Sequence, residues 1–117
     1  MAKFAIVAQP QKDDPGRALH SLLYAKQLHE AGHDVALYYD GEGTAWIGRF
    51  ESPDYPYHDV YNEVQEAGLI GGACRYCAGQ FGATDAVEAS AVEFADHDDD
   101  HPSIARMVGE GRTIITL

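Results

Sequence analysis

The segment KFAIVAQPQKDDPGRALHSLLYAKQLHEAGHDVALYYD, residues 3–40, decides the fold class of this chain. Its opening apolar run, residues 3–8, lacks polar alternation, which is typical of a strand buried on both faces of a parallel sheet. After a short loop, Asp13 or Asp14 is placed to cap a helix. A second strand is expected over residues 34–40, so the segment predicts a strand–helix–strand unit with parallel strands.

The rest of the sequence continues this alternation. Further strands are expected over residues 69–73, 91–95 and 112–117. A glycine-rich turn with a short helical segment is expected over 41–50, and helices are expected over 58–68, 75–82, 84–90 and 101–109. Thr84 is the expected cap of its helix, and Pro102 is expected in a first turn. Alternating strands and helices predict an α/β fold in which helices cover both faces of a parallel sheet. At 117 residues, the chain fits a single domain spanning residues 1–117.

Composition limits the partners of the protein. Acidic residues number 19 against 8 basic ones, for a formal net charge of −11, so nucleic acid and anionic membranes are poor partners for most of this surface. The scarcity of lysine beside abundant aspartate resembles halophilic proteins, those of salt-loving cytoplasms, and an ordinary acidic protein is the alternative interpretation. The sequence shows neither an apolar stretch long enough for a membrane span nor a signal-peptide h-region, so we expect a cytoplasmic protein.

The two cysteines, Cys74 and Cys77, stand in the stretch GLIGGACRYCAGQFGA, residues 68–83. Cys74 is expected where a buried strand becomes a helix, so its sulfur would lie near unpaired N–H groups that lower the pKa of a thiol. Gly71 and Gly72 would leave room for another backbone or a substrate to approach. Cys77 would lie one helical turn further on. In a reducing compartment, such a pair is more often reactive or metal-bound than a permanent disulfide.

Four interpretations of this pair remain open. A structural zinc ion needs four ligands, so His97 and His101 would have to complete the set, although Pro102 and the neighbouring Asp run favour a loop or a helix start there. A thioredoxin-like dithiol is the second, but that motif characteristically follows the first strand rather than the third. The third is simple packing of a helix against the sheet. The fourth is a nucleophilic Cys74 that accepts and passes on sulfur as a persulfide, which needs one accessible thiol of low pKa.

Two further features are candidates for a site or an interface. A group of aromatic residues surrounds a loop and a helix start, and we expect from it either core packing, a subunit contact or the lining of a pocket near Cys74: Trp46, Phe50, Tyr55, Tyr57 and Tyr61. His20, on the first helix, could face the sulfur site, although most such histidines are surface or packing residues. The stretch DHDDDH, residues 96–101, is typical of a solvated acidic loop.

Over nearly its whole length, the chain resembles the DsrE/DsrF-like sulfur-relay family. The resemblance rests on KFAIVA at the start, on the helix-bearing DPGRALHSLLYAKQLHEAGHDVALYYDGEG and above all on GACRYCAGQFGA, with its strand ending in Cys, short helix and turning Gly. It implies a DsrE-like five-stranded, mainly parallel sheet in three α/β/α layers, assembled as homotrimers or hexamers. It also implies that Cys74 is the sulfur-accepting cysteine. Cys77 falls where relatives often have a small residue such as Ala, which permits a resolving role.

We therefore predict a cytoplasmic cysteine persulfide carrier in which Cys74 is the nucleophile and Cys77 is available as a resolving thiol. Its partners would be sulfur donor and acceptor proteins and further copies of itself, with no direct contact to nucleic acid or membrane. Neither an organic cofactor nor a bound metal is expected. The alternative from a different class is a non-catalytic oligomeric binding or assembly module with the same fold.

Overall fold

The fold is described from a computed structural model that covers residues 1–117. At its centre is a sheet of five strands in the order β4-β3-β2-β1-β5, and every neighbouring pair is parallel. The strands are β1 (Lys3–Ala8), β2 (Asp34–Tyr39), β3 (Ile70–Cys74), β4 (Phe94–Ala95) and β5 (Thr113–Thr116). The predicted α/β fold is confirmed, and the sheet is parallel throughout.

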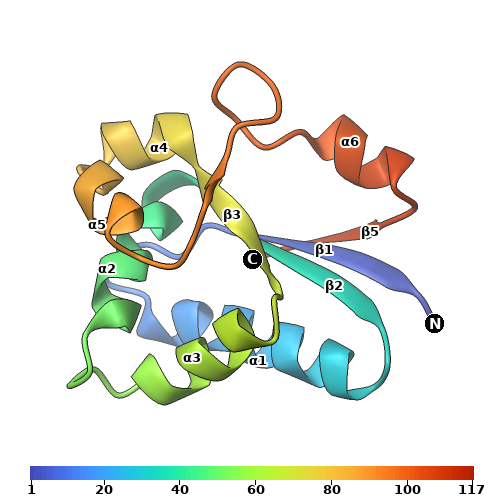
Figure 1. Cartoon of the computed structure of the whole chain (residues 1–117), viewed down its shortest axis with the longest axis horizontal. Coiled ribbons are helices and arrows are strands. Elements are labelled where there is room, and N and C mark those ends of the chain that lie inside the picture. The colour runs from blue at the N-terminus through green and yellow to red at the C-terminus, as the bar shows by residue number, and fades with distance from the viewer.

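Helices flank the sheet on both faces (Figure 1). They are α1 (Pro15–Glu30), the 3-10 helix η1 (Gly41–Ala45), α2 (Trp46–Glu51), α3 (His58–Glu66), α4 (Arg75–Gln80), α5 (Thr84–Glu88) and α6 (Ile104–Gly109). In Figure 1, α1 and α3 lie below the sheet and α6 lies above it, while α2, α4 and α5 gather near the carboxyl end of β3. No helix combines the length and the apolar character that crossing a bilayer requires.

The apolar run of β1 has no polar alternation because both faces of this strand pack against hydrophobic clusters. Ile6 and Ala8 belong to the large core cluster between the sheet and helices α1 and α3. Ala5 and Val7 belong to a second cluster on the opposite face, together with Met107 of α6. All four strand residues are at most 7% exposed, so both faces of this central strand are buried as the sequence predicts.

Helix α1 also begins where the sequence predicts. Of the two candidate caps, Asp14 takes the role, because its Oδ1 accepts a hydrogen bond from the Arg17 backbone N–H at 3.1 Å. Pro15 fills the first helical position, where no N–H is needed. Beyond the helix, Gly32 has a φ of 89°, which lets the chain turn back into β2.

Helix α6 starts later than predicted. The expected start at residue 101, with Pro102 in the first turn, is wrong because Ser103 is the cap: its hydroxyl accepts a hydrogen bond from the Arg106 backbone N–H at 3.1 Å. The helix therefore begins at Ile104. His101 and Pro102 are left in the preceding loop, which frees the His101 side chain to face another part of the molecule.

Two smaller predictions also need correction. Thr84 is the first residue of α5 rather than its cap, and the cap position is taken by Ala83 without a side-chain hydrogen bond. The fourth strand was expected over residues 91–95 but contains only Phe94–Ala95. The missing residues are at its start: pairing with β3 begins only at Phe94, opposite Ala73, and the Val92 N–H donates instead to Ser90 Oγ at 3.0 Å.

The aromatic group named from the sequence belongs mainly to the core. Trp46, Phe50 and Tyr61 are at most 1% exposed, and the Phe50 ring stacks on Tyr61 with centroids 5.3 Å apart. Tyr55 and Tyr57 are partly buried against the same cluster. Because the three largest contributions are internal, packing rather than a subunit contact accounts for this group.

Candidate functional site at the cysteine pair

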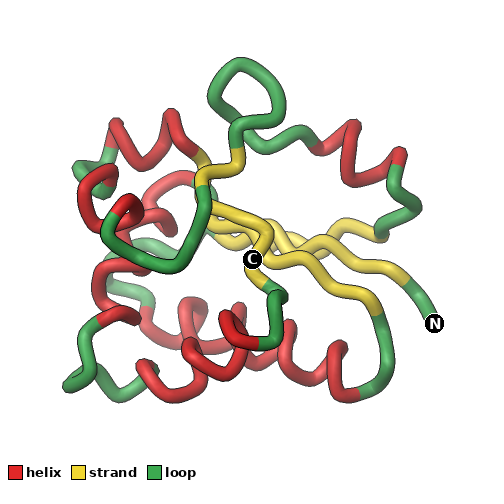
Figure 2. The backbone as a smooth tube through the Cα atoms, in the orientation of Figure 1, coloured by secondary structure: helices red, strands yellow, loops and turns green.

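Both cysteines lie near the carboxyl edge of the sheet, where β3 passes directly into α4 (Figure 2). Cys74 is the last residue of β3 and the cap of α4, and its Sγ accepts a hydrogen bond from the Cys77 backbone N–H at 3.4 Å. The strand-to-helix junction at Cys74 is therefore confirmed. It turns the side chains of Cys74 and Cys77 toward each other across one turn.

The glycines before Cys74 make room for the protein itself rather than for a substrate. A Cβ on Gly71 would lie 2.7 Å from the Tyr38 ring, and one on Gly72 would lie 2.9 Å from the backbone N of Ala95. Only glycine permits these approaches. The close contact between Gly72 and Ala95 lets β4 lie against β3, so the chain that follows β4 continues beside the cysteines.

On the α4 side of the junction, the Cys77 thiol donates a hydrogen bond to Asp40 Oδ1 at 3.4 Å. Asp40 directly follows β2, the neighbour of β3 in the sheet. Its other oxygen, Oδ2, accepts a hydrogen bond from Gln9 Nε2 at 2.8 Å, and Gln9 directly follows β1. Polar groups from three adjacent strand ends thus meet next to the thiol pair.

His101 reaches Cys74 from the loop between β4 and α6. Its Nδ1 lies 3.4 Å from the Cys74 Sγ, and the backbone O of Asp100 lies 3.7 Å from the same sulfur. The Tyr76 backbone N–H donates to that Asp100 oxygen at 3.0 Å, and the Tyr76 ring lies 5.0 Å from the His101 ring. The loop is therefore held against both Cys74 and the start of α4.

This loop is a tight turn that projects above the sheet in Figure 2. The backbone N–H of His101 donates to Asp98 O at 3.0 Å, and the N–H of Asp98 donates to His101 O at 2.9 Å. Between them, Asp99 and Asp100 have φ values of 52° and 69°, in the left-handed region that aspartate tolerates better than most residues. The turn places its backbone over Cys74 and its carboxylates in solvent.

Burial dominates the electrostatics of Cys74. The residue is 0% exposed, and this burial raises the pKa of its thiol to about 12 in spite of the hydrogen bond from the Cys77 backbone N–H, which acts in the opposite direction. The sequence suggested a lowered pKa, because the position at a helix start is visible in the sequence and the covering loop is not. With the loop closed, Cys74 is a protonated thiol.

We expect alkylation to distinguish the two thiols. In reduced, chelator-treated protein, iodoacetamide should modify the partly exposed Cys77 roughly tenfold or more faster than the buried Cys74, since a covered thiol reacts only when its cover opens. Peptide mass spectrometry over a time course measures both rates. In urea-unfolded protein the rates should converge, and equal rates in native protein would contradict the closed loop.

The remaining histidines named from the sequence do not join this site. His97 packs edge-on against Tyr38, with ring centroids 5.9 Å apart, and burial lowers the pKa of its imidazole. His20 turns back onto its own helix, where its Nδ1 lies 2.7 Å from Gly16 O, and its ring lies 5.8 Å from that of Tyr24. Among His20, His97 and His101, only His101 contacts a cysteine.

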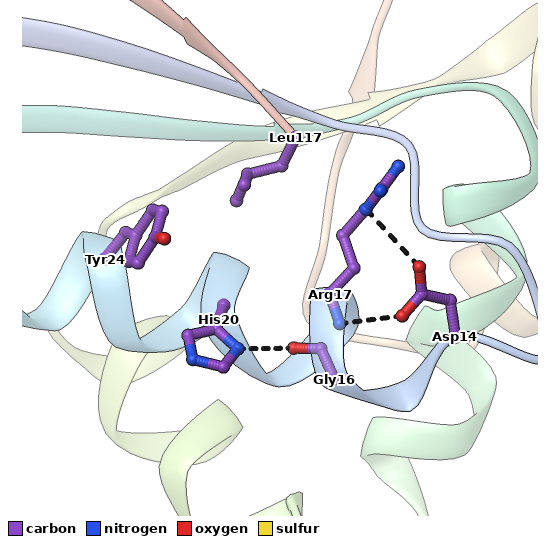
Figure 3. A pocket seen from close by; sticks show the side chains of 6 residues that line it. All are labelled: Asp14, Gly16, Arg17, His20, Tyr24 and Leu117. Carbon is purple, nitrogen blue, oxygen red and sulfur yellow. Dashed lines mark hydrogen bonds and ion pairs between the residues drawn. The ribbon is translucent and has the colours of Figure 1, made fainter.

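His20 instead lines an open hollow of about 390 Å³ between the start of α1 and the end of β5 (Figure 3). The hollow lies beside β1, from which the sheet extends one way to β2 and the other way to β5, and such reversals often bind ligands. Its cation, Arg17, is already paired with Asp14 at 3.4 Å, and both side chains are about half exposed. Because its cation is already paired with a carboxylate, the hollow is a weaker candidate for a functional site than the cysteine pair.

Sequence reasoning missed Asp40 and named His101 only as a zinc ligand. Asp40 could have been found from its position, because it directly follows a predicted strand and strand ends share one edge of a parallel sheet. The place of His101 depends on how the acidic turn folds, for which the sequence carries no periodic signal.

Fold and site together define an all-parallel α/β protein with a thiol pair at the carboxyl edge of its sheet. The chain is 24% identical over 116 residues to the uncharacterized protein MJ0733 of Methanocaldococcus jannaschii, in an alignment that spans 97% of this chain and 93% of that protein. This is a distant archaeal homologue of similar length. No protein-family model matches the sequence, and no solved structure matches it.

Proposed function

We propose that the protein is a DsrE-like persulfide carrier in which Cys74 holds the transferred sulfur. The observation that carries this proposal is the contact between the Cys74 Sγ and His101 Nδ1 at 3.4 Å, with the second thiol, Cys77, one helical turn away. A thiol that burial keeps protonated needs a base within hydrogen-bond reach to become a nucleophile, and the imidazole meets that requirement.

Loading of sulfur begins with the turn closed, when His101 Nδ1 takes the thiol proton of Cys74. The turn then opens, and the uncovered Cys74 thiolate attacks the outer sulfur of a donor persulfide. The S–S bond of the donor breaks, the donor leaves as a thiolate, and Cys74 carries a persulfide. The turn is attached to the rest of the site by few contacts, chiefly the Tyr76 N–H to Asp100 O bond and the His101 contact, so local opening requires little disruption.

Two routes can discharge the carrier. An acceptor thiolate attacks the outer sulfur, takes it and returns Cys74 to its thiolate form. Alternatively, the Cys77 thiolate attacks the inner sulfur and releases hydrosulfide. This leaves a Cys74–Cys77 disulfide, which a thiol reductant must reduce to restore the two thiols. The second route is supported by the placement of the two sulfur atoms within 4.8 Å of each other.

The partners in this scheme are proteins. A donor persulfide and an acceptor thiol must both approach the carboxyl edge near β3, as expected of a member of a sulfur relay. Oligomers of the DsrE type, trimers or hexamers, are part of the same proposal.

Intact-mass measurement tests the assignment of Cys74. Metal-free, reduced protein is incubated with a low-molecular-weight persulfide donor. Cys77→Ala should gain one sulfur atom, the wild type should gain one sulfur atom or form the Cys74–Cys77 disulfide, and Cys74→Ala should gain none. The mass of tryptic peptides locates the added atom. His97→Asn serves as a control from the same loop and should load normally. Loading of Cys74→Ala at the wild-type level would overturn the proposal, and so would native wild-type protein that gains neither a sulfur atom nor a Cys74–Cys77 disulfide.

A further inference from the structure

The geometry points to a zinc site formed by Cys74 Sγ, Cys77 Sγ and the His101 imidazole. These three ligand atoms all lie within 4.8 Å of one another, and the Cys74 Sγ to His101 Nδ1 distance is 3.4 Å. They come from two segments far apart in the sequence, the start of α4 and the loop before α6. The proposal does not depend on the sulfur-carrier function, since it concerns what these atoms bind.

The distances fit tetrahedral coordination. With bonds to zinc of about 2.0–2.3 Å, two ligand atoms of a tetrahedral site lie roughly 3.3–3.8 Å apart. The Cys74–His101 distance already falls in this range. The other two pairs of ligand atoms lie no more than 4.8 Å apart, so they need to approach each other by about 1 Å at most. Side-chain rotation at the partly exposed Cys77 and movement of the surface loop supply that closure.

The chemical type of the ligands selects the metal. Two sulfurs and an imidazole nitrogen suit zinc, whereas magnesium and calcium prefer oxygen ligands. Binding replaces the two thiol protons, which leave to solvent, and the ion balances the two thiolate charges. The ion would thereby stabilise the charged form of Cys74, which burial otherwise disfavours.

Asp40 is placed next to the open fourth position. Its Oδ1 lies 3.4 Å from the Cys77 Sγ, but it is not among the three groups that lie mutually within 4.8 Å. We therefore assign Asp40 the role of accepting a hydrogen bond from a metal-bound water. Gln9 Nε2, which donates to the other carboxylate oxygen at 2.8 Å, fixes its orientation.

A site with three protein ligands and one exchangeable position is typical of zinc ions that bind a small molecule. Water or a thiol is the class of ligand that suits this position, because its O–H or S–H can donate a hydrogen bond to the Asp40 carboxylate. Zinc and a Cys74 persulfide exclude each other because both use the same sulfur atom.

Metal titration of the full chain tests the site. Stripped, reduced protein is titrated with cobalt(II) and then zinc(II), and the wild type should bind one cobalt per chain with thiolate-to-cobalt charge-transfer bands that zinc abolishes. Cys74→Ser and Cys77→Ser should each lose most of the charge-transfer intensity. His101→Asn should weaken binding by roughly tenfold or more, and Asp40→Asn by about tenfold. His97→Asn should bind as the wild type does.

The titration discriminates between ligation by the thiols and ligation by carboxylates. Cobalt bound without charge-transfer bands would indicate the aspartates of the turn rather than the thiols, and would overturn the site even if every variant failed to fold. Binding that His101→Asn leaves unchanged would overturn the assignment of the imidazole. Sulfur loading is measured on the same stripped samples. Loading without metal binding would refute the zinc site alone, and metal binding without loading would refute the carrier function alone.

Discussion

Replacing Trp46 by alanine is expected to lower the free energy of unfolding by about 3–5 kcal/mol. Trp46 is 1% exposed and is the largest fully buried side chain of the protein. Its ring lies 5.7 Å from that of Phe50, and its indole N–H donates to the backbone O of Gln11 at 3.0 Å. The substitution leaves a large cavity and also deprives the Gln11 oxygen of its donor.

Urea unfolding followed by circular dichroism measures this loss. Phe81→Ala is the matched control, because Phe81 is an aromatic residue that is 47% exposed, and its removal should change the free energy of unfolding by less than about 1 kcal/mol. A marginally stable domain has a total of only about 5–15 kcal/mol, so the thermal midpoint of Trp46→Ala should also fall. Equal effects of the two substitutions would show that Trp46 does not occupy the core as described.

Gly72→Ala is expected to lower the free energy of unfolding by about 2–4 kcal/mol and to expose Cys74. The new Cβ would lie 2.9 Å from the Ala95 backbone N and 3.0 Å from the Glu93 O, and backbone atoms cannot move aside as a flexible side chain does. The φ of 153° at Gly72 adds strain for any L side chain. Strand β4 must then separate from β3, and the loop that follows β4 moves with it.

Two measurements check the Gly72→Ala prediction. Urea unfolding gives the stability, and the iodoacetamide labelling rate of Cys74 should rise severalfold as its cover loosens. Gly109→Ala is the matched control, since a Cβ there meets no atom within 4 Å and Gly109 ends helix α6, where alanine is favoured over glycine. A Gly72→Ala variant as stable as Gly109→Ala would contradict the close approach of the two strands.

The features that the sequence predicted well depend on neighbouring residues. The apolar run of residues 3–8 is a strand buried on both faces, and Asp14 caps the first helix, because burial patterns and caps act within a few positions. The position of Cys74 at a strand end also follows from neighbouring residues, the apolar run before it and the helix start after it. Parallel pairing then follows from the alternation of strands and helices.

The features that escaped prediction depend on contacts between distant segments. The cover over Cys74 is formed by residues some 26 positions further along the chain, in an acidic turn whose shape follows no hydrophobic period. Pro102 suggested a first helical turn, but Ser103 offered a competing cap one residue later and moved the start of α6. The burial of Cys74, and with it the direction of its pKa shift, therefore became visible only in three dimensions.

The acidic turn over Cys74 makes access to the thiol sensitive to ionic strength. Asp98, Asp99 and Asp100 are consecutive, and no salt bridge neutralises them, whereas the nearby Asp96 pairs with Arg75 at 3.3 Å. Their mutual repulsion favours an extended loop in dilute solution and weakens as dissolved ions shorten the range of the field to about 10 Å at 0.1 M salt and 3 Å at 1 M. Concentrated salt thus favours the closed loop, and dilution favours an uncovered sulfur.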